Sequence, residues 1–163
     1  MKTTLTPISP DDRKDIIDIF NFYVENSFAA YPEKKLPYEF FDMLLNLCQG
    51  YPNATVKNIS EEVTGFGMLR PYNPMPVFSR TAEITYFIKP GFTGHGIGRT
   101  LLDYLVDEGR KKGITSIIAG ISSLNEGSIR FHLKNGFMEC GRFKNVGQKK
   151  GKLFDVFYCQ KMI

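Results

Sequence analysis

Three glycines alternate with other residues in the segment IKPGFTGHGIGRTLL, residues 88–102. Gly94, Gly96 and Gly98 follow an apolar run and precede a run with helical periodicity. Backbone N–H groups at a helix N-terminus favour anions, and the helix dipole adds to this preference. Glycine lets a phosphate approach the backbone closely because it has no Cβ. The spacing therefore predicts a phosphate-binding loop, with a plain strand–turn–helix connection as the alternative.

Two common phosphate loops do not fit this segment. The string GxxxxGK[ST] does not occur in the chain. The spacing G-x-G-x-G differs from the dinucleotide pattern G-x-G-x-x-G, and it follows the fourth predicted strand rather than the first. A backbone clamp for a pyrophosphate, placed at a helix N-terminus, remains as the interpretation.

An acidic residue interrupts the apolar run TAEITYFI just before the loop. Strand alternation places Glu83 on one face with Thr85 and Phe87. Desolvation raises the pKa of a carboxyl group and can bring it into a range useful for proton transfer. Glu83 is therefore a candidate general base; alternatively it faces solvent or pairs with Arg70 or Arg80.

The rest of the chain supplies the elements that must hold these groups. Ser9 followed by Pro10 predicts a helix start, and Pro37 to Gly50 predicts a second helix. Further helices are expected at 98–112 and 127–134, and strands at 3–8, 53–59, 63–70, 80–89, 114–121, 137–143 and 153–161. This order predicts an α/β (α+β) fold in a single domain, residues 1–163. We expect a mixed, mostly antiparallel central sheet with helices on both faces.

Composition restricts the class of protein. Hydrophobic residues make up 42% of the 163-residue chain and charged residues 23%, as in ordinary globular proteins. No apolar run is long enough for a bilayer, and residues 1–12 contain no signal-peptide core. We therefore expect a cytoplasmic protein whose three cysteines, Cys48, Cys140 and Cys159, are reduced and mostly buried. Two distant histidines give no zinc-ligand spacing, so no metal is expected.

Positive charge is concentrated at the end of the chain. Residues 130–163 hold eight Lys/Arg and two Asp/Glu, a net charge of +6. Such a segment could attract nucleic acid or a small anion. The simpler interpretation is a solvated hairpin turn, because Lys149, Lys150 and Lys152 surround Gly151.

The glycine segment resembles motif A of the GCN5-related N-acetyltransferase superfamily, [QR]-x-x-G-x-[GA]. Thr93 stands where family members commonly have Arg or Gln, a departure from the pattern. A second segment, LNEGSIRFHLKNGF at 124–137, looks like the family's N-x-x-[SA]-x-x-[LF]-[YH]-x-x-x-G-F. His132 and the final VGQKKGKLFDVFYCQ are similar to the phosphinothricin acetyltransferase-type branch, whose ending is V-G-x-K-x-G-x-x-x-D-V-x-x-x-Q.

The resemblance implies acetyl-CoA as co-substrate and an amino acid or analogue as acceptor, such as phosphinothricin or methionine sulfone. It implies Glu83 as the base and His132 as the donor to the leaving thiolate, although His132 could instead be a locally satisfied polar residue. It implies that Asn125 contacts the pantetheine arm. The expected cofactor-binding residues are Phe87, Ile88, Lys89, Thr93, Gly94, His95, Gly96, Ile97, Gly98, Arg99, Asn125 and Ser128. His95 is expected to act through its backbone N–H rather than as a catalyst.

The acceptor pocket is the least defined part of the prediction. FAAYPEKKLP aligns with a segment that carries an arginine in phosphinothricin enzymes, and Tyr31 replaces that arginine. The candidate substrate-binding residues are Phe28, Tyr31, Arg70 and Arg80. The two aromatic residues could equally belong to the core, and the two arginines could be surface residues.

Three functions follow from the sequence and its resemblance. The first is acetyl-CoA-dependent N-acetylation of a small amine, with a different amine or a protein amine as the variant, by a chain that we expect to form a homodimer. The second is a coenzyme A-binding module without catalysis. The third is a nucleic-acid-associated protein that uses the basic hairpin. We favour the first, with no nucleic-acid and no membrane partner.

Overall fold

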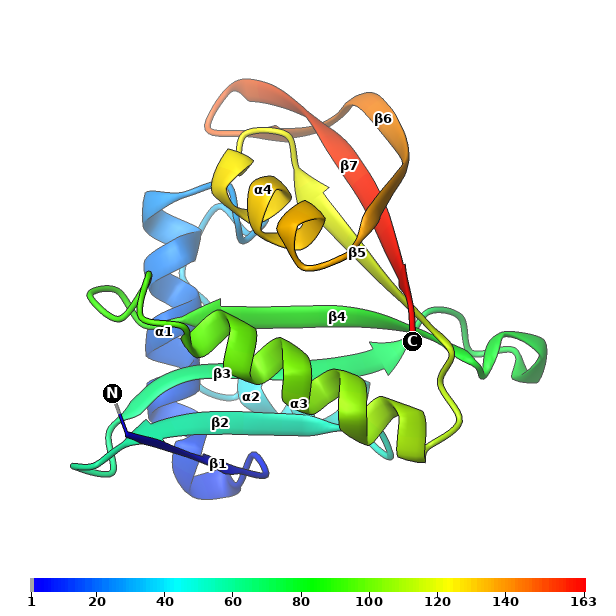
Figure 1. The fold of residues 1–163 in the computed structure, drawn as a ribbon. Coiled ribbons are helices and arrows are strands. Elements are labelled where there is room, and N and C mark those ends of the chain that lie inside the picture. The colour runs from blue at the N-terminus through cyan, green and yellow to red at the C-terminus, as the bar shows by residue number, and fades with distance from the viewer. Residues whose placement is uncertain (1) are drawn as a thin grey trace.

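The computed structural model describes residues 2–163, and a seven-stranded sheet forms their centre (Figure 1). The strands are β1 (Thr3–Thr6), β2 (Asn53–Asn58), β3 (Val63–Pro71), β4 (Thr81–Ile88), β5 (Ser116–Ser122), β6 (Met138–Lys149) and β7 (Lys152–Met162). The α-helices are α1 (Arg13–Asn26), α2 (Phe40–Leu47), α3 (Ile97–Lys111) and α4 (Glu126–Lys134). Two short 3-10 helices, η1 (Pro10–Asp12) and η2 (Pro76–Phe78), complete the order.

The sheet is mixed and mostly antiparallel, which confirms the predicted fold class. Its strand order is β1-β2-β3-β4-β5-β7-β6. The pair β4–β5 is parallel, and the other pairs among the described residues are antiparallel. The helix α3 connects the two parallel strands, as a parallel pair requires a crossover connection.

The parallel strands separate soon after they pair. The register joins Thr81–Glu83 of β4 to Ser116–Ile118 of β5. Both strands continue, β4 to Ile88 and β5 to Ser122, and over this part each pairs with its other neighbour. The sheet is therefore split down the middle, with a gap between the ends of β4 and β5 (Figure 1).

Helices cover both faces of the sheet. In Figure 1, α3 and α4 lie in front of it, and α1 and α2 lie behind. Behind the sheet, one apolar cluster joins α1 and α2 to β3, centred on Ile17, Phe41 and Phe66. In front, a second cluster joins α3 to β4, β5 and β7, with Leu102 and Leu105 at its centre. Leu101 and Val106 of α3 are buried as well.

Several boundaries differ from the sequence prediction. The first helix opens with a 3-10 turn, because the Asp12 carboxylate accepts hydrogen bonds from the Ser9 N–H (2.9 Å) and hydroxyl (3.2 Å). Asp12 also pairs with Lys57 at 3.0 Å, which ties this turn to β2. The second helix begins at Phe40 rather than at Pro37 and ends at Leu47 rather than at Gly50.

The last hairpin is longer than the sequence suggested. A glycine- and lysine-rich turn was expected between residues 143 and 153, but β6 continues to Lys149 and only two residues separate it from β7. The register shifts between Phe143 and Gly147, which lets the strand continue past Asn145, a residue with φ of +52°.

Of the three cysteines, Cys48 and Cys159 are buried, whereas Cys140 is exposed. Within residues 2–163 no helix has both the length and the apolar character needed to cross a membrane.

The contact of β3 with β4 and α3 predicts that Gly67 is required for stability. A Cβ at Gly67 would lie 2.8 Å from the Cβ of Tyr86 and 3.3 Å from a methyl group of Leu105. We expect Gly67→Ala to lower the free energy of unfolding by about 1–3 kcal/mol through overpacking, measured by urea denaturation. Gly141→Ala in β6 is the control, because a Cβ there meets nothing within 4 Å. Equal effects in the two variants would contradict the prediction.

Candidate active site

A cavity of about 1150 Å³ occupies the gap between β4 and β5. The N-terminus of α3, the face of α4 and residues 29–32 after α1 form its remaining walls. A cavity of this size, lined by aromatic residues with a few polar groups, is typical of a site for a small molecule or cofactor. It opens where two parallel strands diverge, which is a common place for a site in a sheet of this kind.

The separated part of β4 offers backbone groups to this cavity. The Lys89 N–H donates to the Thr64 carbonyl of β3 at 2.8 Å. Because an antiparallel strand alternates the direction of its backbone groups, the N–H of Ile88 then points away from β3 and toward the gap. The Ile88 carbonyl accepts a hydrogen bond from the Tyr23 hydroxyl at 2.7 Å, which ties α1 to the end of the strand.

The glycine loop leads into α3 at the edge of the cavity. Gly94 and Gly96 have φ values of +80° and +85°, which side chains with a Cβ rarely adopt. The first N–H groups of α3 lack partners within the helix by geometry, so they are available to an anion. The cavity is lined here by Thr93, Gly94, Gly96, Gly98 and Arg99. This arrangement fits a backbone clamp for a pyrophosphate.

Three residues predicted for cofactor binding do not line the cavity. The Lys89 ammonium pairs with Glu62 at 2.5 Å. Ile97 is buried against β2 and α3. The His95 ring is exposed, and its Nδ1–H donates to the Thr93 carbonyl at 3.0 Å. The side chains of these residues are therefore directed elsewhere, although their backbone groups belong to the same turn.

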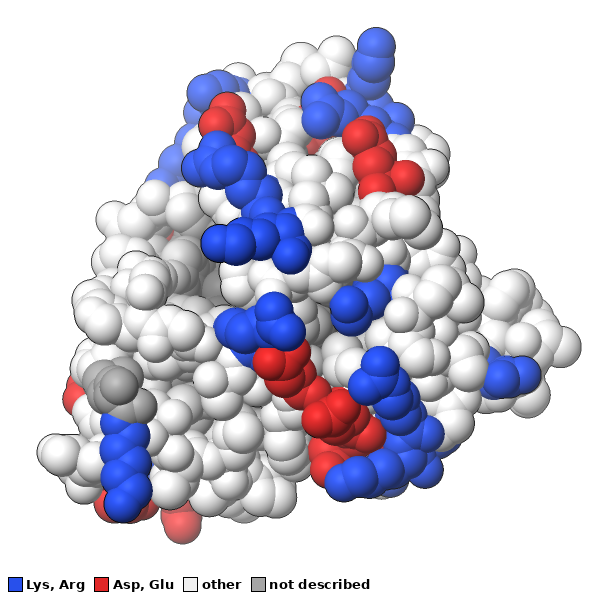
Figure 2. Space-filling model, viewed as in Figure 1, with Lys and Arg blue, Asp and Glu red and all other residues white. Residues whose placement is uncertain are grey.

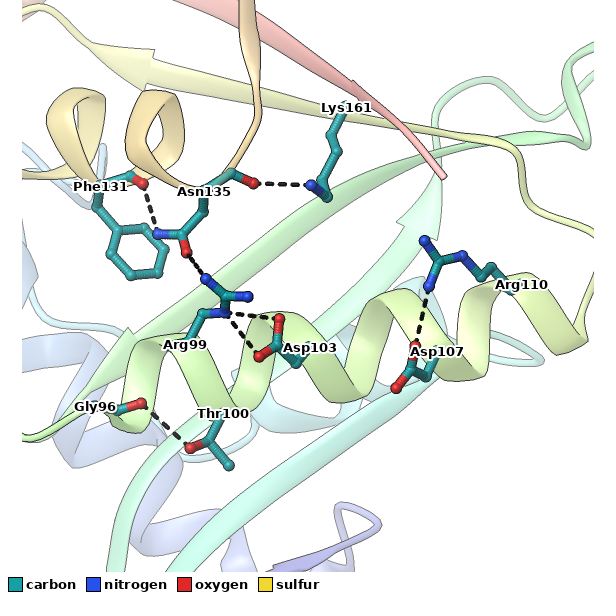
Figure 3. A network of polar contacts seen from close by, with 9 residues as sticks. All are labelled: Gly96, Arg99, Thr100, Asp103, Asp107, Arg110, Phe131, Asn135 and Lys161. Carbon is teal, nitrogen blue, oxygen red and sulfur yellow. Dashed lines mark hydrogen bonds and ion pairs between the residues drawn. The ribbon is translucent and has the colours of Figure 1, made fainter.

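Positive charge near the loop comes from Arg99 and Lys134, which both line the cavity, rather than from position 93. Arg99 bonds Asp103 through Nε (2.7 Å to Oδ2) and the Asn135 side chain through Nη1 at 2.7 Å (Figure 3). Asn135 in turn donates to the Phe131 carbonyl at 2.8 Å, so the network joins α3 to the end of α4. Farther along α3, acidic side chains are followed by basic ones at the end of the helix, and Asp107 and Glu108 pair with Arg110 and Lys111 (Figure 2).

Glu83 lies on the wall of the cavity beside Arg70 of β3. The two residues are directly opposite in the β3–β4 register, and their side chains form an ion pair. The Glu83 side chain is 22% exposed. Burial raises the pKa of the Glu83 carboxyl, and the charge of Arg70 partly opposes that shift. By sequence alone, an ion pair with Arg70 is an alternative to a role as general base. In the structure Glu83 both pairs with Arg70 and lines the cavity.

His132 of α4 is buried and fully hydrogen-bonded. Its Nδ1 lies 2.7 Å from the Ser128 carbonyl, which can only accept, so Nδ1 carries the proton. Its Nε2 lies 2.7 Å from the hydroxyl of Tyr86 on β4. Burial lowers the pKa of His132, so the ring is neutral near pH 7 and Nε2 accepts from Tyr86. Both His132 and Tyr86 line the cavity, and the hydrogen bond joins their side chains there.

The start of α4 presents a second polar edge. Asn125 is the N-cap, and its side-chain oxygen accepts from the Ser128 N–H at 3.3 Å. Both residues line the cavity, as predicted for contacts to a cofactor. Because capping uses the Asn125 oxygen, its amide N–H groups are the part left for a ligand.

The opposite end of the cavity is aromatic. Tyr31 and Pro32 line it from one side, and Tyr158 of β7 lines it from the other. Burial raises the pKa of Tyr31, and the charges of Tyr158 and Glu83 add to the shift, which places these groups in one neighbourhood. The other two predicted acceptor residues lie elsewhere: Phe28 packs against Phe154, and Arg80 is exposed before β4.

Sequence reasoning missed several lining residues. Tyr86, Tyr23 and Tyr158 each have the alternation or helical spacing of core residues, and nothing local indicates that a gap exposes them. Phe20, Phe40, Phe92 and Lys134 also line the cavity and were not predicted to do so. No three His, Cys, Asp or Glu side chains gather into a metal site within the described part of the chain.

A split sheet, an anion-binding helix N-terminus beside it and a carboxylate on the opposite wall together define an acyl-CoA-dependent N-acyltransferase. The model of the Acetyltransferase (GNAT) family matches residues 16–137, and the chain belongs to that family. It is an acetyl-CoA-dependent N-acetyltransferase, as its motifs implied. The phosphinothricin N-acetyltransferase of Streptomyces coelicolor is 29% identical over 160 residues, covering 93% of this chain and 91% of the relative.

Solved structures agree with this assignment. A phosphinothricin acetyltransferase from Sinorhizobium meliloti in complex with acetyl-CoA has a TM-score of 0.94 and 25% identity, covering 100% of this chain and 89% of that one. A ribosomal-protein-alanine N-acetyltransferase from Brucella melitensis has a TM-score of 0.92 and 31% identity, covering 98% and 99%. The names of these two proteins give different acceptors, so the similarity does not identify the acceptor of this chain.

We predict that Gly98 is needed for binding acetyl-CoA rather than for the stability of the fold. A Cβ at Gly98 would meet only the Phe131 ring, at 3.5 Å, which is ordinary contact. We expect Gly98→Ala to leave the melting temperature unchanged or slightly higher, because alanine favours helix. Its Kd for acetyl-CoA should rise about tenfold, measured by calorimetry. An unchanged Kd would show that the pyrophosphate does not approach this residue.

Proposed function

We propose that the chain acetylates the α-amino group of a small amino acid or close analogue, of the phosphinothricin or methionine sulfone type. The observation that carries this proposal is Glu83, a half-buried carboxylate with a raised pKa on the cavity wall. A free amino group is mostly protonated near pH 7, so a base must remove its proton before it can attack, and Glu83 is the proposed base. The similarity to the Streptomyces coelicolor phosphinothricin enzyme supports the acceptor class.

In this mechanism the amine attacks the thioester of acetyl-CoA directly. Glu83 removes the proton from the ammonium group, either directly or through water. The oxyanion that forms on the thioester carbonyl is stabilised by the N–H of Ile88, which faces the gap. Arg70 pairs with Glu83 and opposes the rise of its pKa, which favours the carboxylate form.

The leaving thiolate receives its proton through Tyr86 and His132. His132 is neutral at rest and takes up a proton from solvent for this step. Nε2–H then donates to the Tyr86 oxygen while the Tyr86 hydroxyl gives its own proton to the sulfur. His132 then returns to the neutral state in which Nε2 accepts from Tyr86. The Ser128 carbonyl supports this by holding the Nδ1 proton throughout.

Glu83→Gln tests the base. We expect kcat to fall by about 10²–10⁴-fold, because the amide cannot accept the ammonium proton. The Kd for acetyl-CoA should stay unchanged. The acidic limb of the wild-type kcat/KM profile should lie above the usual glutamate range, since burial raises the Glu83 pKa, and it should vanish in the variant. Glu108→Gln, on the exposed face of α3, is the control. Full activity in Glu83→Gln would remove Glu83 from the mechanism.

A double-mutant cycle tests the proton path. We expect Tyr86→Phe and His132→Asn each to lower kcat by up to about a hundredfold, and the double variant to be no worse than either single one. Tyr104→Phe, a partly buried tyrosine on α3, is the matched control. Additive losses in the cycle would mean that the two residues act separately.

A thiol-release assay with acetyl-CoA tests the acceptor class. The panel should contain the common amino acids, methionine sulfone and phosphinothricin. A peptide with an N-terminal alanine belongs in it as well, because the Brucella melitensis structure is named for that type of acceptor. Turnover of the peptide alone would favour a protein amine, and turnover of none would favour a coenzyme A-binding module.

We also propose a homodimer, as the resemblance implies, with a cytoplasmic location, as the composition and the cysteines led us to expect. The support in the structure is the edge of the sheet, where β6 is the last strand. Met138, Phe143, Val146 and Leu153 of the β6–β7 hairpin are exposed although apolar. Two of the hairpin lysines, Lys149 and Lys150, donate to carbonyls of their own chain, which leaves fewer of them to bind nucleic acid.

A further inference from the structure

Lys149, at the end of β6, is a fully buried lysine. Its residue is 1% exposed, and its ammonium group donates three hydrogen bonds, to the carbonyls of Val24 (2.7 Å), Ser27 (2.8 Å) and Ala30 (2.6 Å). A lysine ammonium has three protons, and all three are used. The hairpin thus places a charge inside the protein instead of offering it to solvent.

The position of this charge suits the end of a helix. Val24 belongs to the last turn of α1, and Ser27 is its C-cap. Carbonyls at a helix C-terminus lack partners within the helix and lie at the negative end of its dipole. The ammonium satisfies these carbonyls and also reaches Ala30 beyond the helix. In Figure 1 the turn of the β6–β7 hairpin lies above this end of α1.

Other residues of the β6–β7 hairpin also contact residues 24–33. Gly147 leaves room for the Phe154 ring, because a Cβ there would lie 2.2 Å from it. Phe154 stacks on Tyr31, with ring centroids 5.6 Å apart and planes at 17°. The Lys150 N–H donates to the Glu33 carboxylate at 2.8 Å. The VGxKxG motif takes no part in the proposed catalytic steps. Its residues instead hold residues 24–33 through these contacts.

Residues 24–33 include one wall of the cavity. Ala29, Ala30, Tyr31 and Pro32 line it, on the aromatic end where Glu83 lies. The cofactor end is built from different elements: the loop before α3, the free edge of β4 and the start of α4. A change confined to residues 24–33 should therefore affect the amine and spare acetyl-CoA.

We infer that Lys149 is a positioning residue for the acceptor: its buried ammonium holds residues 24–33 in the form that shapes the amine-binding end of the cavity. The inference rests on the proposed function, in that the aromatic end is taken as the amine site. Loss of the ammonium leaves three carbonyls to find new partners, and the loop can satisfy them only by moving toward water.

The test compares Lys149→Met with Lys144→Met. Methionine keeps much of the length and apolar surface of lysine and removes the three donors. Lys144 lies on the same strand, exposed. For Lys149→Met we expect KM for the amine to rise about tenfold and the Kd for acetyl-CoA to change less than twofold. Amide hydrogen exchange should accelerate in residues 24–33, whereas the control should match the wild type.

A second variant covers the case in which Lys149→Met does not fold. Phe154→Leu keeps the ammonium and removes the stacking on Tyr31, so it should raise the amine KM in the same selective way. Parallel losses of amine and acetyl-CoA affinity, or unchanged KM and exchange in residues 24–33, would overturn the inference.

Failure of the proposed function would look different. If the wild type acetylates no amine in the panel, the exchange rates in residues 24–33 still decide whether Lys149 holds that segment. Faster exchange in Lys149→Met would then show that Lys149 holds residues 24–33, although the acceptor proposal fails. Unchanged exchange would show that Lys149 does not hold this segment, whatever the acceptor proves to be.

Discussion

The backbone pairing of the parallel strands β4 and β5 stops at Glu83 and Ile118, although both strands run on. A sheet normally satisfies its backbone groups with a neighbouring strand, so this separation leaves polar groups of β4 facing a cavity. The cavity, the direction of the Ile88 N–H and the access of Tyr86 to the reaction site all follow from it. The Tyr23 hydroxyl, bonded to the Ile88 carbonyl, ties α1 to the end of β4, and the network around Arg99 joins α3 to the end of α4.

Three sets of polar groups at or near the cavity have their hydrogen-bond and ion-pair partners within the chain. Glu83 pairs with Arg70, His132 is held between Ser128 and Tyr86, and Lys149 donates to three carbonyls. An unpaired buried donor or acceptor would be costly, which explains why each group has its partner. The same pairing fixes the orientation of the groups that meet the ligands, so stability and positioning have a common cause.

The order of elements, the fold class and the cofactor loop were predictable because they depend on neighbours in sequence. Glycine spacing, helix starts and strand alternation act over a few residues, and the predicted helices and strands appear in the predicted order. The hairpin was misjudged because its lysines meet partners more than a hundred residues away. Phe28 and Arg80 are placed outside the cavity for the same reason: the path of the loops, which no local pattern contains, decides where they point.

The sequence by itself indicated the family and the cofactor through the resemblance of its motifs, and it indicated the candidate base through the acidic residue within TAEITYFI. These motifs can be recognised because their residues are neighbours in sequence. Only the tertiary structure decided that Glu83 is paired with Arg70, that His132 is bonded to both Tyr86 and Ser128, and that Lys149 is buried at the end of α1. Each of these depends on which side chain meets which across the sheet or between hairpin and helix. Such contacts are set by the packing of distant segments, and no local pattern of residues encodes them.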